Sequence, residues 1–207
     1  KELKSDFELQ ITGGLMVAET EKDISFLKKK IIAEKKAGIE MELLGGEDVR
    51  NCIPNVSKKI LAAAYCPGEG KINPMLATPA LAKEAERLGT KIFLETTVLS
   101  IKKEKQHFLL ETNRGIIKSK YLVNAAGGWS SQISEMLGIK IPVLSAPQQM
   151  IVTESSVPII PSMISHAHRH LTMKQIKNGN LIIGGGWFAG FNKEMNRTIN
   201  YRNAISG

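Results

Sequence analysis

The sequence predicts an α+β fold made of two interleaved domains, one mixed and layered and the other mainly antiparallel. Three observations support this fold class. Short apolar runs separated by turn residues alternate with helical segments in the first half of the chain. Strand-like segments dominate beyond Pro142, and Asn178-Gly179 is a strong two-residue signal for a β-hairpin among them.

The first apolar runs, residues 7–11 and 15–18, are broken by Thr12-Gly13-Gly14 and predict a hairpin. A helix follows, with Thr20 as its cap and Asp23 three residues further on. We expect this helix to end at Gly38 and to cover part of the antiparallel sheet with three apolar side chains, Ile24, Leu27 and Ile31.

Two further helices are expected before residue 90. The first covers residues 47–52 and stops at Pro54. The second covers residues 76–88 and ends at Gly89. A proline inside a helix removes one backbone hydrogen bond, so this second helix should begin at Thr78-Pro79, or kink there if it begins at Pro74.

Strands make up most of the remaining chain. Residues 91–94 and 98–103 read as strands, and residues 107–112 and 116–124 as a hairpin that turns at residues 113–115. A helix ending near Gly138 comes next. The last strands are residues 143–153 and the hairpin of residues 170–177 with 180–183, and these should pair with the first hairpin in a complete antiparallel sheet.

Composition narrows the class of protein. The 207 residues are 43% hydrophobic and 23% charged, as in ordinary soluble globular proteins. No apolar run approaches the roughly 18 residues that a membrane span needs, and the start does not resemble a signal peptide. We interpret Cys52 and Cys66, the only cysteines, as reduced core residues of a cytoplasmic protein.

The net charge of +8 raises the question of nucleic-acid binding. The lysines are dispersed, and aromatic residues, at 5% of the chain, are not interleaved with them as a base-stacking surface requires. Solvated lysine faces are therefore the preferred interpretation, and no nucleic-acid partner is expected.

The segment Ala125-Ala126-Gly127-Gly128-Trp129 follows a predicted strand and precedes a helix. Small residues at such a junction let the backbone approach a ligand closely, although a glycine after a strand is more often a plain turn. Trp129 has two interpretations as well: an indole that opens a helix is usually a core residue, and the alternative is contact with a ligand.

Several collinear stretches resemble the D-amino-acid oxidase and sarcosine oxidase superfamily of FAD enzymes. They are residues 67–74, 85–92, 97–101, 122–130 and 181–186. Residues 169–175 resemble the branch that contains sarcosine oxidase beta subunits and glycine oxidase. The resemblance covers nearly the whole chain.

This resemblance implies an α/β portion of an FAD domain at residues 73–140, and a substrate domain with an antiparallel sheet at residues 1–72 and 141–207. It places Val98 beside the adenine of FAD, Ala125, Ala126 and Gly127 near its phosphate and ribitol, and Trp129 as a possible flavin contact. Arg169, His170 and Lys174 become substrate-side candidates. No catalytic residue is assigned.

The chain departs from the family pattern in three places. It has no Gly-x-Gly-x-x-Gly turn after a first strand, because Gly184-Gly185-Gly186 follows a late hairpin. We expect that turn before Lys1, and a glycine-rich flavin segment beyond Gly207, so that the chain is an interior fragment that does not retain FAD by itself. Residues 72–74 contain no His, the residue that attaches FMN covalently in some sarcosine oxidase beta subunits.

His166, His168 and His170 alternate, so on one strand they would share a face that a metal ion could use. No acidic residue or cysteine lies near them in sequence, so structural or surface histidines are the preferred interpretation and no metal is expected.

The resemblance implies that the full-length protein oxidises the C–N bond of a small amine or amino acid to an imine with FAD. Oxygen, a quinone or a partner subunit would then accept the electrons. The alternative is a subunit-interaction or structural module of an oxidoreductase complex, without catalysis of its own.

Overall fold

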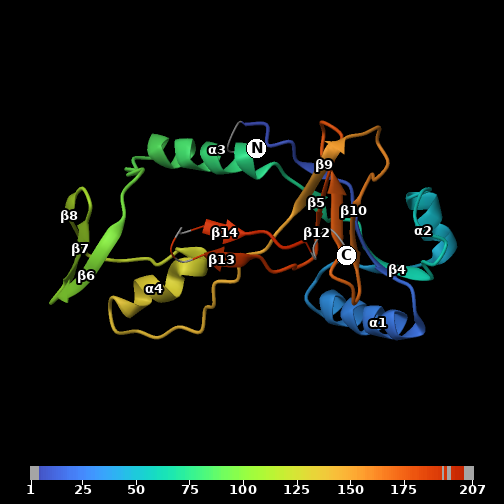
Figure 1. Cartoon of the computed structure of the whole chain (residues 1–207), viewed down its shortest axis with the longest axis horizontal. Helices are drawn as coiled ribbons and strands as arrows, with labels where there is room; N and C mark the ends of the chain where they lie inside the picture. Colours follow the sequence, from blue (N-terminus) through green and yellow to red (C-terminus); the bar gives the residue numbers. More distant parts are fainter. Residues whose placement is uncertain (1–4, 193, 195–196, 203–207) are drawn as a thin grey trace. The chain divides into compact units, whose positions relative to one another are not determined.

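The computed structural model describes residues 5–192, 194 and 197–202 (Figure 1). The chain divides into two compact units: residues 1–83 together with 148–207 form unit 1, and residues 84–147 form unit 2. Both units mix helices with strands, which confirms the α+β class. The assignment of residues 73–140 to an FAD domain, and of the flanking segments to a substrate domain, stays a prediction.

Unit 1 is built on a seven-stranded sheet in the order β3-β4-β2-β10-β11-β12-β9. In that order the strands are Glu42–Gly45, Ala62–Cys66, Gly14–Ala18, Met163–His166, Thr172–Gln175, Asn180–Gly184 and Ile151–Ser155. Every neighbouring pair is antiparallel except β2 with β10, which is parallel. The expectation of a wholly antiparallel sheet is therefore wrong at this pair.

The first predicted hairpin is also wrong. Residues Gln10–Ile11 (β1) pair with Gly70–Lys71 (β5), whereas β2 lies between β4 and β10. The reason is that β2 is buried on both faces of the sheet, and such a central strand needs a partner along each edge. Gly13 (φ +73°) makes the turn between β1 and β2 at a point where an added Cβ would collide with the ring of Tyr65.

Two helices cover opposite faces of the sheet at its β3-β4-β2 end (Figure 1). Helix α2 (Gly46–Cys52) packs Val49 and Ile53 against Leu15 and Val17 of β2. Helix α1 (Glu21–Lys36) instead packs against Ala18 and its neighbours on the other face. Successive residues of a strand point to opposite faces, so one strand supports both cores.

Helix α1 forms as predicted. The Thr20 side chain accepts a hydrogen bond from the backbone N–H of Asp23, and the Asp23 carboxylate accepts one from the backbone N–H of Thr20. Leu27 and Ile31 are buried, Ile24 is partly buried, and Gly38 (φ +83°) follows the last turn.

Helix α3 spans Pro74–Arg87, so the predicted start at Thr78-Pro79 is wrong. Asn73 caps the helix instead, because its side-chain oxygen accepts a hydrogen bond from the N–H of Met75. Pro79 lies inside the helix, and the expected kink there stays a prediction. Gly89 (φ +98°) ends the helix as expected.

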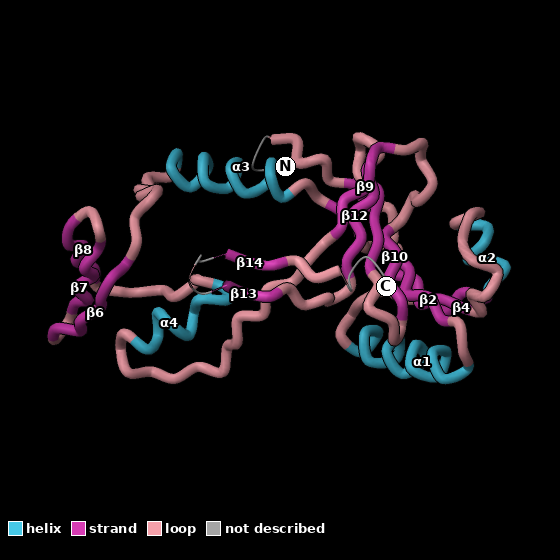
Figure 2. The backbone as a smooth tube through the Cα atoms, viewed as in Figure 1, coloured by secondary structure: helices cyan, strands magenta, loops and turns pink. Residues whose placement is uncertain are grey.

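Unit 2 contains a three-stranded meander of β6 (Val98–Glu104), β7 (His107–Thr112) and β8 (Gly115–Ser119), seen as short strands in Figure 2. The 3-10 turn η1 (Gly127–Trp129) and helix α4 (Ser130–Glu135) follow. The hairpin at residues 113–115 is confirmed, but β8 ends five residues before Asn124.

The predicted strand at residues 91–94 is wrong. The structure assigns no strand there, and Leu94 is 75% exposed. A strand requires a hydrogen-bonded neighbour, and no described segment pairs with residues 91–94 or 120–126. The last strands differ too: β9 begins only at Ile151, while β10, β13 (Gly190–Asn192) and β14 (Arg197–Ile199) were not predicted.

Candidate functional site

The residues predicted to contact FAD all lie in unit 2. Val98 opens β6, half-buried and paired with Thr112 of β7. Ala125, Ala126 and Gly127 lie on the chain that leads into η1, and Ala125 and Gly127 are exposed. The structure thus leaves this backbone open to a ligand.

The side chain of Asn124 stabilises the turn at residues 125–127 through hydrogen bonds, a role that was not predicted from the sequence. Its side-chain oxygen accepts a hydrogen bond from the N–H of Ala126 at 3.2 Å. Its amide nitrogen donates to the carbonyl of Ser130 at 2.8 Å and to Oγ of Ser134 at 3.0 Å. An Asn side chain tends to hydrogen-bond the backbone two residues further along the chain, and this tendency could have indicated the role of Asn124 from the sequence.

Trp129 is 64% exposed. Its interpretation as a core residue of this chain is therefore wrong. Since an exposed indole leaves a large apolar surface in water, the position is compatible with contact to a ligand or to another chain segment.

The turn has the chemistry needed to approach a large polar cofactor such as FAD. Gly127 adopts φ +55°, a conformation that favours glycine, and no atom lies within 4 Å of where a Cβ would be placed. The main chain at the exposed Ala125 and Gly127 can therefore meet a cofactor without displacing a side chain. The open space beside Gly127 shows that the residues of this turn are compatible with binding of FAD.

The three substrate-side candidates lie in unit 1, and the structure does not bring them together. Arg169 forms an ion pair with Glu19. The His170 ring lies against Trp187, with ring centroids 5.6 Å apart, and its Nδ1 is 2.9 Å from the carbonyl oxygen of Gly185. Lys174, on β11, lines a cavity to which Arg169 and His170 do not contribute.

That cavity measures about 470 Å³, a size that suits a small organic molecule. Its walls come from β5, β11, β12 and the start of α3. Ile72, Ile176 and Ile182 supply part of the apolar wall, and the charged residues are Glu8, Lys71, Lys174 and Lys177. We call it the Lys71–Lys174 cavity.

The strand register explains why Lys174 faces this cavity. Lys174 pairs with Ile182 across β11 and β12, so the two side chains share a face of the sheet. Its neighbours Met173 and Gln175 point to the other face, where Met173 packs on the α2 core and Gln175 is buried.

Lys71 is the residue of this cavity that the sequence analysis missed. Its Nζ donates a hydrogen bond to the carbonyl of Gln175 at 2.6 Å. Burial lowers the pKa of Lys71 below its ordinary value, and the positive charge of Lys174 lowers it further. Lys71 and Lys174 are about a hundred residues apart, and no local pattern signals their approach.

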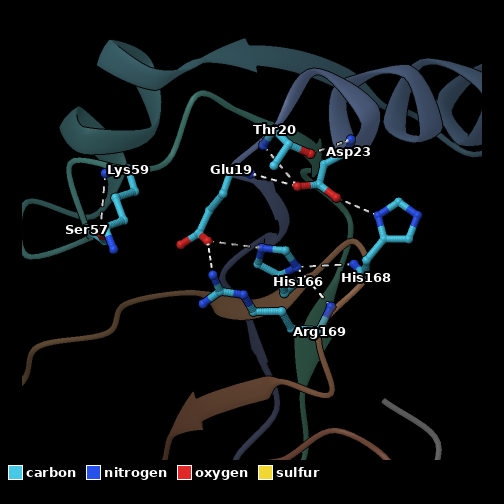
Figure 3. A network of polar contacts seen from close by, with 8 residues as sticks. All are labelled: Glu19, Thr20, Asp23, Ser57, Lys59, His166, His168 and Arg169. Atoms are coloured by element: carbon cyan, nitrogen blue, oxygen red, sulfur yellow. Dashed lines mark hydrogen bonds and ion pairs between the residues drawn. The ribbon is translucent and has the colours of Figure 1, made fainter.

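A polar network joins the start of α1 to the segment that follows β10 (Figure 3). The buried Asp23 carboxylate accepts hydrogen bonds from the N–H groups of Glu19 and Thr20 and from Nδ1 of His168. Burial alone raises the pKa of Asp23, but these bonds, with that of the Thr20 side chain, outweigh burial and lower the pKa from 3.8 to about 2.

His166 completes the network. Its Nδ1 accepts hydrogen bonds from the backbone N–H groups of His168, at 3.1 Å, and Arg169, at 3.0 Å. Its proton therefore resides on Nε2, which is buried and lies 3.9 Å from a carboxylate oxygen of Glu19. The network fixes the backbone that leads to His170 and β11.

The three alternating histidines do not share one strand face. Only His166 lies in β10, and each ring has a different neighbour. Over the described residues, no three His, Cys, Asp or Glu side chains are grouped as a metal ion would require. Both cysteines are free thiols, but Cys52 is exposed, so its interpretation as a core residue is wrong.

Comparison with known proteins identifies the family. Residues 1–204 match the model of the FAD dependent oxidoreductase family, and the chain belongs to it. The chain is 28% identical to sarcosine oxidase subunit beta of Arthrobacter sp. over 193 residues, which are 90% of this chain and 48% of that protein. It is 28% identical to glycerol 3-phosphate dehydrogenase of Caloramator mitchellensis over 179 residues, 83% of this chain and 37% of that protein.

Among solved structures, L-proline dehydrogenase from P. horikoshii superposes with a TM-score of 0.84 at 25% identity. The match covers 99% of this chain and 56% of that one. The present chain thus spans about half the length of these relatives or less. The resemblance noted in the sequence is confirmed, including the link to sarcosine oxidase beta subunits, and the family's cofactor is FAD.

None of the helices described in this structure is both long and apolar enough to cross a membrane.

Proposed function

We propose that the full-length protein containing this chain uses FAD to oxidise the C–N bond of a small amine or amino acid. The family match over residues 1–204 carries this proposal. When bound, FAD would supply the two-electron acceptor for oxidation of the C–N bond to an imine, which water would hydrolyse, and the residues of this chain would bind and orient the cofactor and the substrate.

In this proposal the exposed turn at Ala125, Ala126 and Gly127 contacts FAD through its main chain, with Val98 nearby on the cofactor's adenine side. Asn124 keeps the turn in shape. Trp129 supplies apolar surface. Lys174 faces the substrate from the sheet, and Arg169 acts through Glu19 by holding the segment between β10 and β11. His170, which packs against Trp187 outside this cavity, stays a separate substrate-side candidate.

A second candidate reaction is oxidation of glycerol 3-phosphate, because one relative with 28% identity carries that name. An amino acid carries a carboxylate and glycerol 3-phosphate carries a phosphate at neutral pH, and a lysine-lined cavity can accommodate either anionic group. The match to sarcosine oxidase subunit beta covers more of both chains, which favours the amine reaction.

The proposal is tested by anaerobic reduction of the FAD in the purified full-length protein. Sarcosine, dimethylglycine, glycine, proline and glycerol 3-phosphate are added separately, and bleaching of the flavin absorbance is followed. Bleaching by an amine supports the proposal. Bleaching by glycerol 3-phosphate alone would replace it with the second candidate.

We further propose that a partner subunit accepts electrons or completes the enzyme, because the relative from Arthrobacter sp. is named as a subunit. The competing view is a structural module without catalysis. Full-length protein that holds FAD stoichiometrically but is bleached by no substrate would favour that view. The free thiols of Cys52 and Cys66 support a cytoplasmic location.

A further inference from the structure

The Lys71–Lys174 cavity has an excess of positive charge. Two half-buried lysines face it, with a third lysine, Lys177, exposed at its wall. The only acidic residue among the described lining residues is Glu8. Like charges close together in a partly desolvated space repel each other, so an anion placed between them is stabilised.

Lys71 and Lys174 have ammonium N–H groups that are available to a ligand. Lys71 uses one N–H on the carbonyl of Gln175, which leaves two. Lys174 has no hydrogen bond or ion pair with any residue that the structure describes, so all three of its N–H groups are available. Among the described residues Glu8 forms no ion pair with either lysine, and one of its carboxylate oxygens accepts a hydrogen bond from the side chain of Asn73 at 2.9 Å.

The start of α3 also lines the cavity, but it is not the source of recognition. The N–H groups of Met75, Leu76 and Ala77 all bond to Asn73. A ligand there meets only the positive end of the helix dipole, so specific contact falls to the lysines.

We infer that the Lys71–Lys174 cavity binds the oxyanion group, a carboxylate or a phosphate, of a small organic molecule, and that this molecule is the substrate of the proposed reaction. The identification of this molecule as the substrate rests on the proposed function, whereas the anion-binding site itself does not. The apolar wall formed by Ile72, Ile176 and Ile182 then holds the carbon skeleton.

The test uses the full-length protein with FAD and two inert probes, acetate and inorganic phosphate, with sodium chloride at equal ionic strength. Lysines are acetylated at pH 8 and quantified one by one by peptide mass spectrometry. Lys71 should react readily because its pKa is lowered. Acetate or phosphate should reduce its labelling at least threefold, while exposed Lys102 stays unchanged.

Variants sharpen the test. A charged hydrogen bond contributes enough free energy that Lys174→Gln should weaken probe protection of Lys71 about tenfold or more. Lys174→Arg should retain protection, and Lys102→Gln is the matched control. Protection by acetate alone identifies the group as a carboxylate, and protection by phosphate alone as a phosphate.

Equal labelling of Lys71 with and without both probes would overturn the inference, even if amine oxidation were observed. Protection of Lys71 in a protein that oxidises no amine would leave the anion site standing and remove the proposed function. In an active enzyme, Lys174→Gln should raise KM at least tenfold and leave kcat within about threefold; a loss confined to kcat would contradict substrate binding at this site.

Discussion

The imidazole of His168 donates a hydrogen bond to the carboxylate of Asp23, which lies 145 residues earlier in the chain. Asp23 is at the same time part of the capping box of α1. One carboxylate therefore both starts a helix and anchors the segment that leads into β11. Because of this double role, titration of Asp23 should change the stability of the fold.

Acid should destabilise the fold through Asp23. Its pKa is about 2 in the folded protein, below the ordinary value of 3.8. A carboxylate with a lowered pKa stabilises the fold above its unfolded pKa and loses that contribution as pH falls through the folded pKa. The window is thus about pH 4 down to about pH 2, and the contribution is on the order of 2 kcal/mol.

The measurement is urea unfolding at pH 7 and at about pH 2. Asp23→Ala should lower the free energy of unfolding by about 1–2 kcal/mol at pH 7 and by much less at the lower pH. Glu40→Gln, at an exposed position, is the control. His168→Ala should raise the pKa of Asp23, and an acid transition that does not move would contradict the role of their hydrogen bond.

The hydrophobic cluster between α1 and the sheet should be destabilised by substitutions that create a cavity. Leu27 is fully buried in a cluster with Ala18, Met41 and Ala64. Leu27→Ala should lower the free energy of unfolding by about 2–5 kcal/mol, because it removes buried methyl groups and leaves a void. Ile32→Ala, on the exposed face of the same helix, should change it by less than about 0.5 kcal/mol. Similar losses for both variants would mean that α1 does not pack as described.

Asn124 should matter for cofactor binding in the full-length protein. Asn124→Ala removes three hydrogen bonds that hold the turn before η1. Each is worth about 1 kcal/mol, so the dissociation constant for FAD should rise about tenfold or more. Fluorescence titration of apoprotein with FAD measures this change. Gln132→Ala, exposed on α4, is the control, and equal affinities would show that the turn does not contact the cofactor.

The 207-residue chain expressed alone should be colourless. It has the turn at residues 125–127 but no Gly-x-Gly-x-x-Gly turn to bind the pyrophosphate. The measurement is an absorbance spectrum of the purified chain after incubation with excess FAD and desalting. A retained flavin band near equimolar amount would show that the residues present suffice.

The sequence predicted elements whose signals are local. The capping box at Thr20 and Asp23, the stop at Gly38 and the Asn178-Gly179 hairpin each depend on a few adjacent residues, and all are present in the structure. The same holds for the hairpin at residues 113–115. Such signals act within one turn of chain, so neighbouring sequence is sufficient to read them.

Errors arose where the partner is distant or the signal ambiguous. The apolar run of β2 was assigned to a hairpin because its true neighbours, β4 and β10, lie far along the chain. The alanine-rich β4 carries no strand preference in its composition. In the candidate site, the family resemblance predicted Lys174 but not Lys71, because only the folded sheet brings Lys71 to the same cavity.

The parallel pairing of β2 with β10 has a consequence for biogenesis. Residues Gly14 to Val17 lie beside Met163 to His166, and the nearby bond between Ser162 and Thr12 spans 150 residues. During translation, β2 emerges long before β10 exists, so its edge stays unpaired while most of the chain is made. The local β6–β8 meander and the β3-β4-β2 part of the sheet can form in that interval, whereas the β2–β10 pair cannot form until His166 has been synthesised.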